Sequence, residues 1–272
     1  MKLWRNVLVH VDDNLGTPDG LENSRLLAEA FGGRVFESPG EEGTPGRALL
    51  RCAARSGSDL IVKATSAADV RQMTVSGAAA LHLLRTSPVP VLLHAPPARR
   101  SGRIIAAVNL SGTTPESKKL DEQVVLAAAQ LSRLESAELH VVCVADRARD
   151  RLYESILHPA QYRRYLAEDR DDLRRSLAAL TARLGPRSVP HLVEGNAVDA
   201  LGTIAIELEA DAVTLGRADA DAGVGGYFAE RLFCRIDRSV LLVTSKHAET
   251  PSNDTGTWKA RLRTFGAEPA QP

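Results

Sequence analysis

Two segments, EGTPGRALLRCAARSGSDLIV (Glu42–Val62) and EGNAVDALGTIAIELEADAVT (Glu194–Thr214), follow one pattern without a gap. A Glu-Gly pair, an Ala-Leu pair and a closing Asp fall at the same positions in both. Two later segments, GAAALHLLRTSPVPVLL (Gly77–Leu93) and GYFAERLFCRIDRSVLL (Gly226–Leu242), align in the same way. The chain therefore contains two copies of one structural unit, which is the first thing to establish about any fold.

The distance between the copies changes along the chain. The opening strands, NVLVHVDDN (Asn6–Asn14) and RIIAAVNLS (Arg103–Ser111), are 97 positions apart, whereas the Glu-Gly segments are 152 apart and the closing segments 149. The first unit therefore lacks about 55 residues, and we expect these to be the strand LHVVCVA, the long arginine-rich helix Asp150–Leu184 and the start of the next strand. The second unit is three residues shorter somewhere in Arg217–Gly225.

Within each unit, nearly continuous apolar strands alternate with amphipathic helices. This alternation is typical of a parallel sheet buried on both faces by helices. We therefore predict an α/β fold of two tandem Rossmann-like, doubly wound parallel-sheet domains, the first of them truncated. The predicted boundaries are residues 1–97 and 101–247, followed by a disordered tail at 248–272. Pro88 and Pro90 predict that the first unit ends in a strand near a sheet edge.

Composition excludes several classes of protein. Apolar residues make up 44% and charged residues 25% of the chain, and the formal net charge is zero. Neither nucleic acid nor a membrane surface is therefore an expected partner, and the N-terminus lacks the pattern of a signal peptide. We expect a cytoplasmic location. Cys52, Cys143 and Cys234 lack the spacing of a metal site or a disulfide framework, so we expect no metal and three unreactive thiols.

The stretch LGRADADAGVGGYFAERLFCRID (Leu215–Asp237) runs from an apolar strand through a glycine cluster into a predicted helix. Such a loop can bind phosphate, because glycines expose backbone N–H groups and the helix N-terminus carries a partial positive charge. In doubly wound sheets, ligands bind at the carboxyl ends of the strands. The loop is therefore the first candidate for a nucleotide site.

Three segments together resemble the universal stress protein family, in its tandem, UspE-type branch. They are DLIVKATSAADVRQ with LHLLRTSPVPV, IIAAVNLSGTTPESKKLDEQVVLAAAQL, and GYFAERLFCRIDRSVLLV. The resemblance implies a role in stress resistance, including resistance to DNA damage, and it implies no established reaction. Members of the family that bind ATP share a GxxG pattern followed, after nine residues, by Gly and Ser or Thr.

This sequence departs from that pattern. Gly216 and Gly226 are separated by nine residues, but the pattern then requires a glycine where Val213 stands. Tyr227 takes the place of the hydroxyl residue. Two aspartates between the glycines would repel a phosphate by about 1–4 kcal/mol each at contact range. We therefore expect no bound nucleotide, with weak binding of ATP or AMP through the second unit as the alternative.

The residues that could form a vestigial nucleotide site in the second unit are Asn109, Gly195, Gly216, Gly226 and Tyr227. Two residues of the first unit occupy related positions. Asp12 faces a ribose or adenine in the family, but without a phosphate loop a capping or turn role is the stronger interpretation. Gly77 aligns with Gly226, and both are interpreted as sites of close packing or a tight turn.

No histidine has the spacing of a Ser/His/Asp group, so we expect no catalysis. The arginine-rich run alternates in charge with Glu and Asp, which is typical of a solvated helix face, with a partner surface as the functional alternative. The truncated first unit should expose a sheet edge, and an exposed edge must be covered. We therefore expect a homodimer, acting through contacts with another protein or a small apolar ligand.

Overall fold

A computed structural model of the chain places both units in one nine-stranded sheet with the order β2-β1-β3-β4-β9-β8-β5-β6-β7. The structure describes residues 4–10, 34–37, 45–95, 99–112, 114–184, 188–218 and 222–245. The strands are β1 (Asn6–His10), β2 (Arg34–Glu37), β3 (Leu60–Ala64), β4 (Val91–His94), β5 (Arg103–Val108), β6 (Glu138–Asp146), β7 (Ser188–Gly195), β8 (Ala212–Arg217) and β9 (Ser239–Thr244). The doubly wound α/β fold predicted from the repeats is confirmed.

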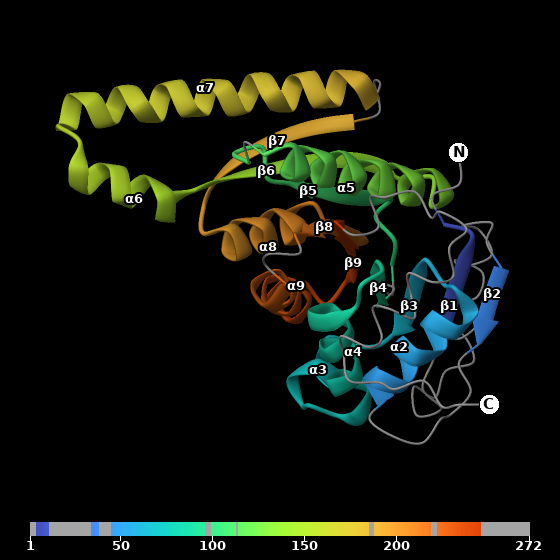
Figure 1. Cartoon of the computed structure of the whole chain (residues 1–272). Helices are drawn as coiled ribbons and strands as arrows, with labels where there is room; N and C mark the ends of the chain where they lie inside the picture. The colour runs from blue at the N-terminus through green and yellow to red at the C-terminus, as the bar shows by residue number, and fades with distance from the viewer. Residues whose placement is uncertain are drawn as a thin grey trace.

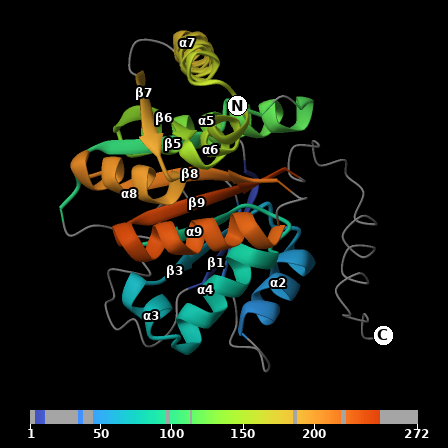
Figure 2. The ribbon, with the colours of Figure 1, turned by 90° about the vertical axis from the view of Figure 1, so that its left-hand side faces the viewer.

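Helices cover both faces of the sheet (Figure 1, Figure 2). They are α2 (Pro45–Ser56), α3 (Ala67–Arg71), α4 (Val75–Thr86), α5 (Pro115–Leu134), α6 (Arg147–Ile156), α7 (Pro159–Leu184), α8 (Ala197–Glu207) and α9 (Ala222–Ile236). Apolar residues of α5 and α7 form one core with one face of the sheet. The second core, on the other face, contains α2, α3, α4, α8 and α9. Every strand buried between the cores is rich in Val, Ile and Leu, as a parallel sheet requires.

The two units meet through β4 and β9, which are the antiparallel pair among otherwise parallel described strands. Leu92 lies opposite Leu241, its own counterpart at an offset of 149 positions. The units are therefore related by an approximate two-fold axis through this pair. The prediction that the first unit ends near a sheet edge is wrong, because β4 pairs with β9 of the second unit on its outer side.

The content of the truncated unit also differs from expectation. Strand β2 pairs with β1 in the position that β6 holds beside β5. The first unit therefore keeps a second strand, and what it lacks among the described residues is a counterpart of β7 and of the helices before it. A run as short as RVFE gives too little periodicity to be recognised from sequence. The homodimer remains a prediction, but its argument from a missing second strand no longer holds.

The arginine-rich segment forms two helices rather than one. Helix α6 ends at Ile156, and α7 begins at Pro159. Proline lacks the N–H that a helix interior needs but fits the first helical position, so the chain turns at Leu157–His158. None of the described helices is both long and apolar enough to cross a membrane. The predicted tail, residues 248–272, lies outside the described residues.

Candidate functional site

The strand order reverses at β5, which lies between β8 and β6. Such a switch point is where doubly wound sheets bind their ligands. Asn109 follows β5 directly and is exposed, and its backbone N–H donates to Oδ1 of Asp121 on α5, with an N···O distance of 2.8 Å. Gly216 lies near the end of the neighbouring β8. The structure therefore brings two of the predicted residues, Asn109 and Gly216, to adjacent strand ends.

Helix α5 closes over this switch point. A Cβ atom at Gly216 would lie 2.8 Å from Cγ of Leu120, so glycine permits the close approach of α5 to β8. Asp121, on the next position of α5, is 9% exposed. Its burial raises the pKa of the carboxyl group to about 6, although the hydrogen bond from the Asn109 backbone opposes the shift. A buried acid that accepts a backbone N–H holds the strand end in place.

Arg217, the last residue of β8, crosses from the second unit to the first. Its side chain is 4% exposed, and its guanidinium donates to the backbone carbonyls of Leu84 and Ser87 at the C-terminal end of α4. A positive group at this position satisfies carbonyls that have no partner in the helix and interacts favourably with the helix dipole. Arg217, which directly follows Gly216, therefore caps α4 of the other unit.

Gly226 on α9 also packs against α4. A Cβ atom there would lie 2.7 Å from Cα of Arg85 and 2.8 Å from the carbonyl oxygen of Leu84. The two helix backbones therefore touch at this point, in agreement with the close packing expected for this glycine. Tyr227, the next residue, is 53% exposed. Residues 219–221, which contain both loop aspartates, lie outside the described residues.

The remaining predicted residues lie apart from this contact. Gly195 ends β7 with φ of +146°, a backbone conformation that favours glycine. It precedes Asn196, whose side chain caps α8 by accepting from the N–H groups of Val198 and Asp199. β7 is two strands away from β5, so Gly195 is not at the switch point.

In the first unit, Gly77 lies on α4 against α3. A Cβ atom at this glycine would collide with the backbone carbonyl of Asp69, which again agrees with the expected close packing. Thr74 caps α4 by accepting from the N–H of Gly77, with an N···O distance of 3.2 Å. Asp12 lies outside the described residues.

A buried polar cluster of the first unit was not foreseen from the sequence. Lys63 on β3 is 0% exposed, and its Nζ donates to Oγ of Ser76 on α4 at 3.2 Å. Oγ1 of Thr65 lies 3.4 Å from the same hydroxyl. The available signal was a single charged residue within the apolar strand LIVKA. The cluster lies at the carboxyl end of β3, beside the first turn of α4.

The described titratable groups provide few candidates for other chemistry. No group of three or more His, Cys, Asp or Glu residues within the described ranges could hold a metal ion. Nδ1 of His140 and Nε2 of His191 lie 2.8 Å apart, and burial lowers the pKa of both rings. Burial likewise raises the pKa of the Cys143 thiol to about 11. Burial thus favours the neutral form of both imidazoles and of the thiol.

No protein-family model matches the sequence, and no curated protein matches it. Solved structures do resemble the chain. A protein of unknown function from Pseudomonas aeruginosa PAO1 is 18% identical with a TM-score of 0.66, covering 96% of this chain and 98% of that one. A protein from Pseudomonas aeruginosa UCBPP-PA14, named as a candidate universal stress protein, is 20% identical with a TM-score of 0.66. The match covers 97% of this chain and 98% of that one.

A universal stress protein from Archaeoglobus fulgidus DSM 4304 is 17% identical with a TM-score of 0.54, covering 88% of this chain and 86% of that one. At these identities the likenesses show a shared fold. Because the two Pseudomonas aeruginosa structures are covered almost from end to end, the shared fold includes both repeat units and not one of them alone.

Proposed function

We propose that the chain is a tandem universal stress protein of the UspE type that acts in the cytoplasm without catalysis and without a bound nucleotide. The fold shared with universal stress proteins over nearly the whole chain supports the family, and the sequence resemblance supports the branch. Its role would be resistance to stress, including DNA damage, exerted through contacts with another protein or with a small apolar ligand.

The observation that carries the absence of a nucleotide is the use of the candidate loop in a contact between the two units. Arg217 and Gly226 stand on either side of the loop, and both engage the C-terminal part of α4. A nucleotide phosphate would need backbone N–H groups at the start of α9 that are open to a ligand. Helix α9 begins at Ala222, so Gly226 lies in its second turn, beyond the N–H groups that a helix start leaves free, and it packs on α4.

Weak binding of ATP or AMP in the second unit is the second candidate. It is favoured by the positions of Asn109 and Gly216, which lie at adjacent strand ends at the switch point. The two candidates differ in a direct measurement. Titration calorimetry with Mg-ATP and with AMP should show no binding tighter than about 100 μM, which corresponds to about 5.5 kcal/mol of binding free energy. A tighter complex would replace the first candidate with the second.

The stress role needs a separate experiment. Removal of the gene from its host should lower survival after ultraviolet irradiation, and expression of the intact chain should restore it. A matched control is the variant Glu122→Gln, which alters an exposed ion pair with Arg183 and should restore survival equally well. Equal survival with and without the gene, under DNA damage and under oxidative and starvation stress, would refute the proposed role.

A further inference from the structure

Strand β7 carries a histidine that contacts a histidine of the neighbouring strand. β7 stands at one end of the sheet order, and among the described strands it pairs with β6 alone (Figure 1). His140 of β6 lies opposite Val189, and His191 of β7 lies opposite Val142, so the two rings are diagonal neighbours. Nδ1 of His140 lies 2.8 Å from Nε2 of His191, with the ring planes inclined by 29°. The edge strand is therefore joined to β6 through side chains as well as through the backbone.

The histidine pair lies on the face of the sheet that α8 covers. His140 is 4% exposed, and His191 is half-buried. Helix α8 packs on β6 and β7 and contributes Leu201, Ile204 and Ala205 to the core on this side. The described charged groups that act on the rings are Glu138, two residues before His140 on β6, and Arg103 on the adjacent β5. A charge on His140 is therefore stabilised or opposed by these groups rather than by water.

The surroundings indicate which nitrogens carry the protons of the neutral pair. A hydrogen bond between two neutral imidazoles needs one N–H and one lone pair. Nε2 of His140 lies 3.2 Å from Oε2 of Glu138, and a lone pair on this nitrogen would face the negative charge. The proton of His140 therefore belongs on Nε2. Its Nδ1 then accepts a hydrogen bond from the Nε2–H of His191.

Protonation changes this arrangement in two steps. The first proton can enter at Nδ1 of His191, which takes no part in the bond between the rings, so that bond stays intact. A second proton has to enter at Nδ1 of His140, where two N–H groups would then face each other across 2.8 Å. Both rings would also carry a positive charge with their centroids 5.1 Å apart, and Glu138 can balance only one of these charges. The doubly protonated pair therefore loses its contact.

The sign of the pH effect follows from the same surroundings. Burial lowers the pKa of both imidazoles below the ordinary value of 6.5, Glu138 partly opposes this shift, and Arg103 adds to it at His140. The unfolded chain therefore takes up these protons at a higher pH than the folded chain does. Above pH 6.5 the contribution of the pair to stability is complete, and it is lost as the pH falls from 6.5 toward the lowered pKa values.

We propose that His140 and His191 form an acid-sensitive latch, which holds β7 on β6 at neutral pH and releases it when both rings are protonated. As an edge strand, β7 can separate without disturbing the other described strand pairings. Its release would also separate Glu194 from Arg170 of α7, whose Nε lies 3.3 Å from Oε1 of Glu194. The latch gives the chain a structural response to acidification. This response goes beyond the proposed stress role and does not depend on it.

Hydrogen–deuterium exchange of the full chain, read by mass spectrometry at pH 6.5 and pH 5.5, measures the opening of β7. The rates are corrected for the pH dependence of intrinsic exchange. Between these pH values, each histidine that gains a proton on opening raises the opening equilibrium by about fivefold at most. Peptides from β7 should therefore exchange more than fivefold faster at pH 5.5, because both histidines are protonated. Peptides from β9, in the middle of the sheet, should keep their exchange rate.

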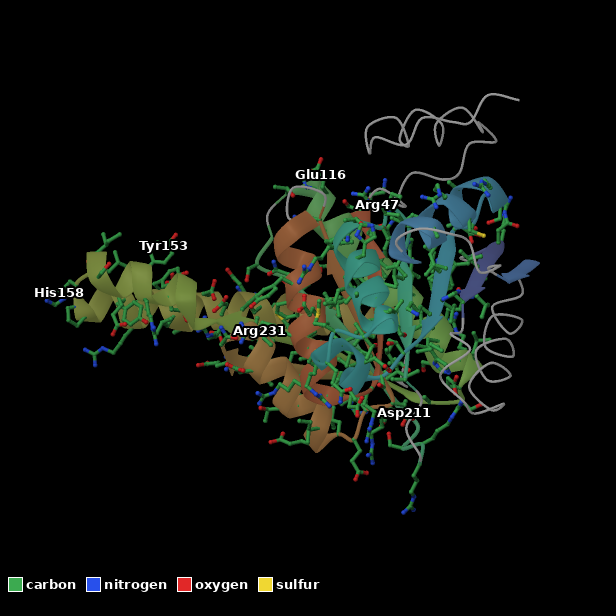
Figure 3. The ribbon with its side chains drawn as sticks, turned by 90° about the horizontal axis from the view of Figure 1, so that it is seen from below. Arg47, Glu116, Tyr153, His158, Asp211 and Arg231 are labelled. Atoms are coloured by element: carbon green, nitrogen blue, oxygen red, sulfur yellow. The ribbon has the colours of Figure 1, made fainter. Side chains whose placement is uncertain are left out.

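The variant His191→Gln separates the latch from other effects of acid. Its side-chain amide can donate to Nδ1 of neutral His140 or, after rotation, accept from the protonated ring, so neither state breaks the contact. The acceleration of β7 should then be fivefold or less. His140→Asn places an amide near the same point and should give the same result if His191→Gln does not fold. The matched control is His158→Gln, because His158 is exposed in the turn between α6 and α7, far from the sheet (Figure 3).

The control should keep the acceleration of the parent chain, and circular dichroism at pH 7.5 checks that each variant is folded. The proposal is overturned if β7 of the parent accelerates by fivefold or less. It is also overturned if β9 accelerates as much as β7, because the opening would then be global. Acceleration of more than fivefold in a folded His191→Gln variant, or its loss in His158→Gln, would equally exclude the latch.

Discussion

Replacement of Asp121 by Asn should stabilise the protein at neutral pH. The carboxyl group lies under the strand end at Asn109, and its burial raises the pKa from an ordinary value of 3.8 to about 6. Below pH 3.8 the group is protonated in both the folded and the unfolded chain and contributes nothing. Between pH 3.8 and 6 the unfolded chain releases the proton first, so stability falls as pH rises.

The full cost applies above pH 6. A shift of about two pKa units corresponds to about 3 kcal/mol at 1.36 kcal/mol per unit. The side-chain amide introduced by Asp121→Asn would carry no charge, and its oxygen would accept from the Asn109 N–H as the carboxylate does. The pKa of about 6 already includes the hydrogen bond from Asn109, so no further term is subtracted. The net gain expected from Asp121→Asn at pH 7.5 is therefore about 3 kcal/mol.

Urea unfolding, followed by circular dichroism at intervals from pH 4 to pH 8, measures this gain. The difference between Asp121→Asn and the parent chain should be near zero at pH 4 and grow until about pH 6.5. The control Glu122→Gln removes a neighbouring charge on the exposed side of α5 and should change stability by less than about 0.5 kcal/mol at every pH. A variant less stable than the parent at pH 7.5, or a gain that does not vary with pH, would refute the reasoning.

Three further predictions concern the contact between the units and the buried thiol. Arg217→Met should lower the free energy of unfolding by about 3 kcal/mol, because it leaves two carbonyls of α4 without their charged donor. Urea unfolding measures this loss. An unchanged free energy of unfolding would mean that solvent replaces the donor, and would contradict the prediction. Gly226→Ala should destabilise by about 1–3 kcal/mol in thermal unfolding, although Ala is the better helix former, because its methyl group would meet the α4 backbone; a raised melting temperature would contradict this packing. Cys143 should react with a thiol reagent at pH 8 only after the protein unfolds, and the half-buried Cys52 serves as an internal comparison. If Cys143 and Cys52 of the native protein react at equal rates, the burial of Cys143 is contradicted.

The repeated sequence predicts the fold well because duplication doubles the signal. Each unit alternates apolar strands with helices, and each strand and helix expected from the aligned segments is present within the described residues. What the repeat could not give is how the units meet. A strand that ends one copy looks the same in sequence whether its outer edge faces solvent or another strand. The partner residues of β4 on β9 lie 147 to 151 positions further along the chain.

The candidate site was predicted in part. Asn109 and Gly216 lie together because the carboxyl ends of adjacent parallel strands meet at one edge of a sheet. The role of Arg217 could not be predicted from the sequence, since its acceptors lie 130 and 133 positions earlier, at the C-terminal end of α4. Pro159 indicates the turn between α6 and α7, because proline favours the first position of a helix. The alternating charges of the arginine-rich run led instead to the prediction of one continuous helix.

The two units, once joined, no longer perform equivalent tasks at equivalent positions. Arg217 stands where the first unit has Thr65, at an offset of 152, and the threonine hydroxyl stays within its own unit, beside Ser76. Leu215 likewise corresponds to Lys63, so one unit buries an apolar side chain where the other buries an amine. A ligand that fits the strand ends of one unit therefore has different chemistry from a ligand that fits the other. Arg217, at a strand end of the second unit, holds α4 of the first, so that strand end has a structural task that the corresponding strand end at Thr65 does not have.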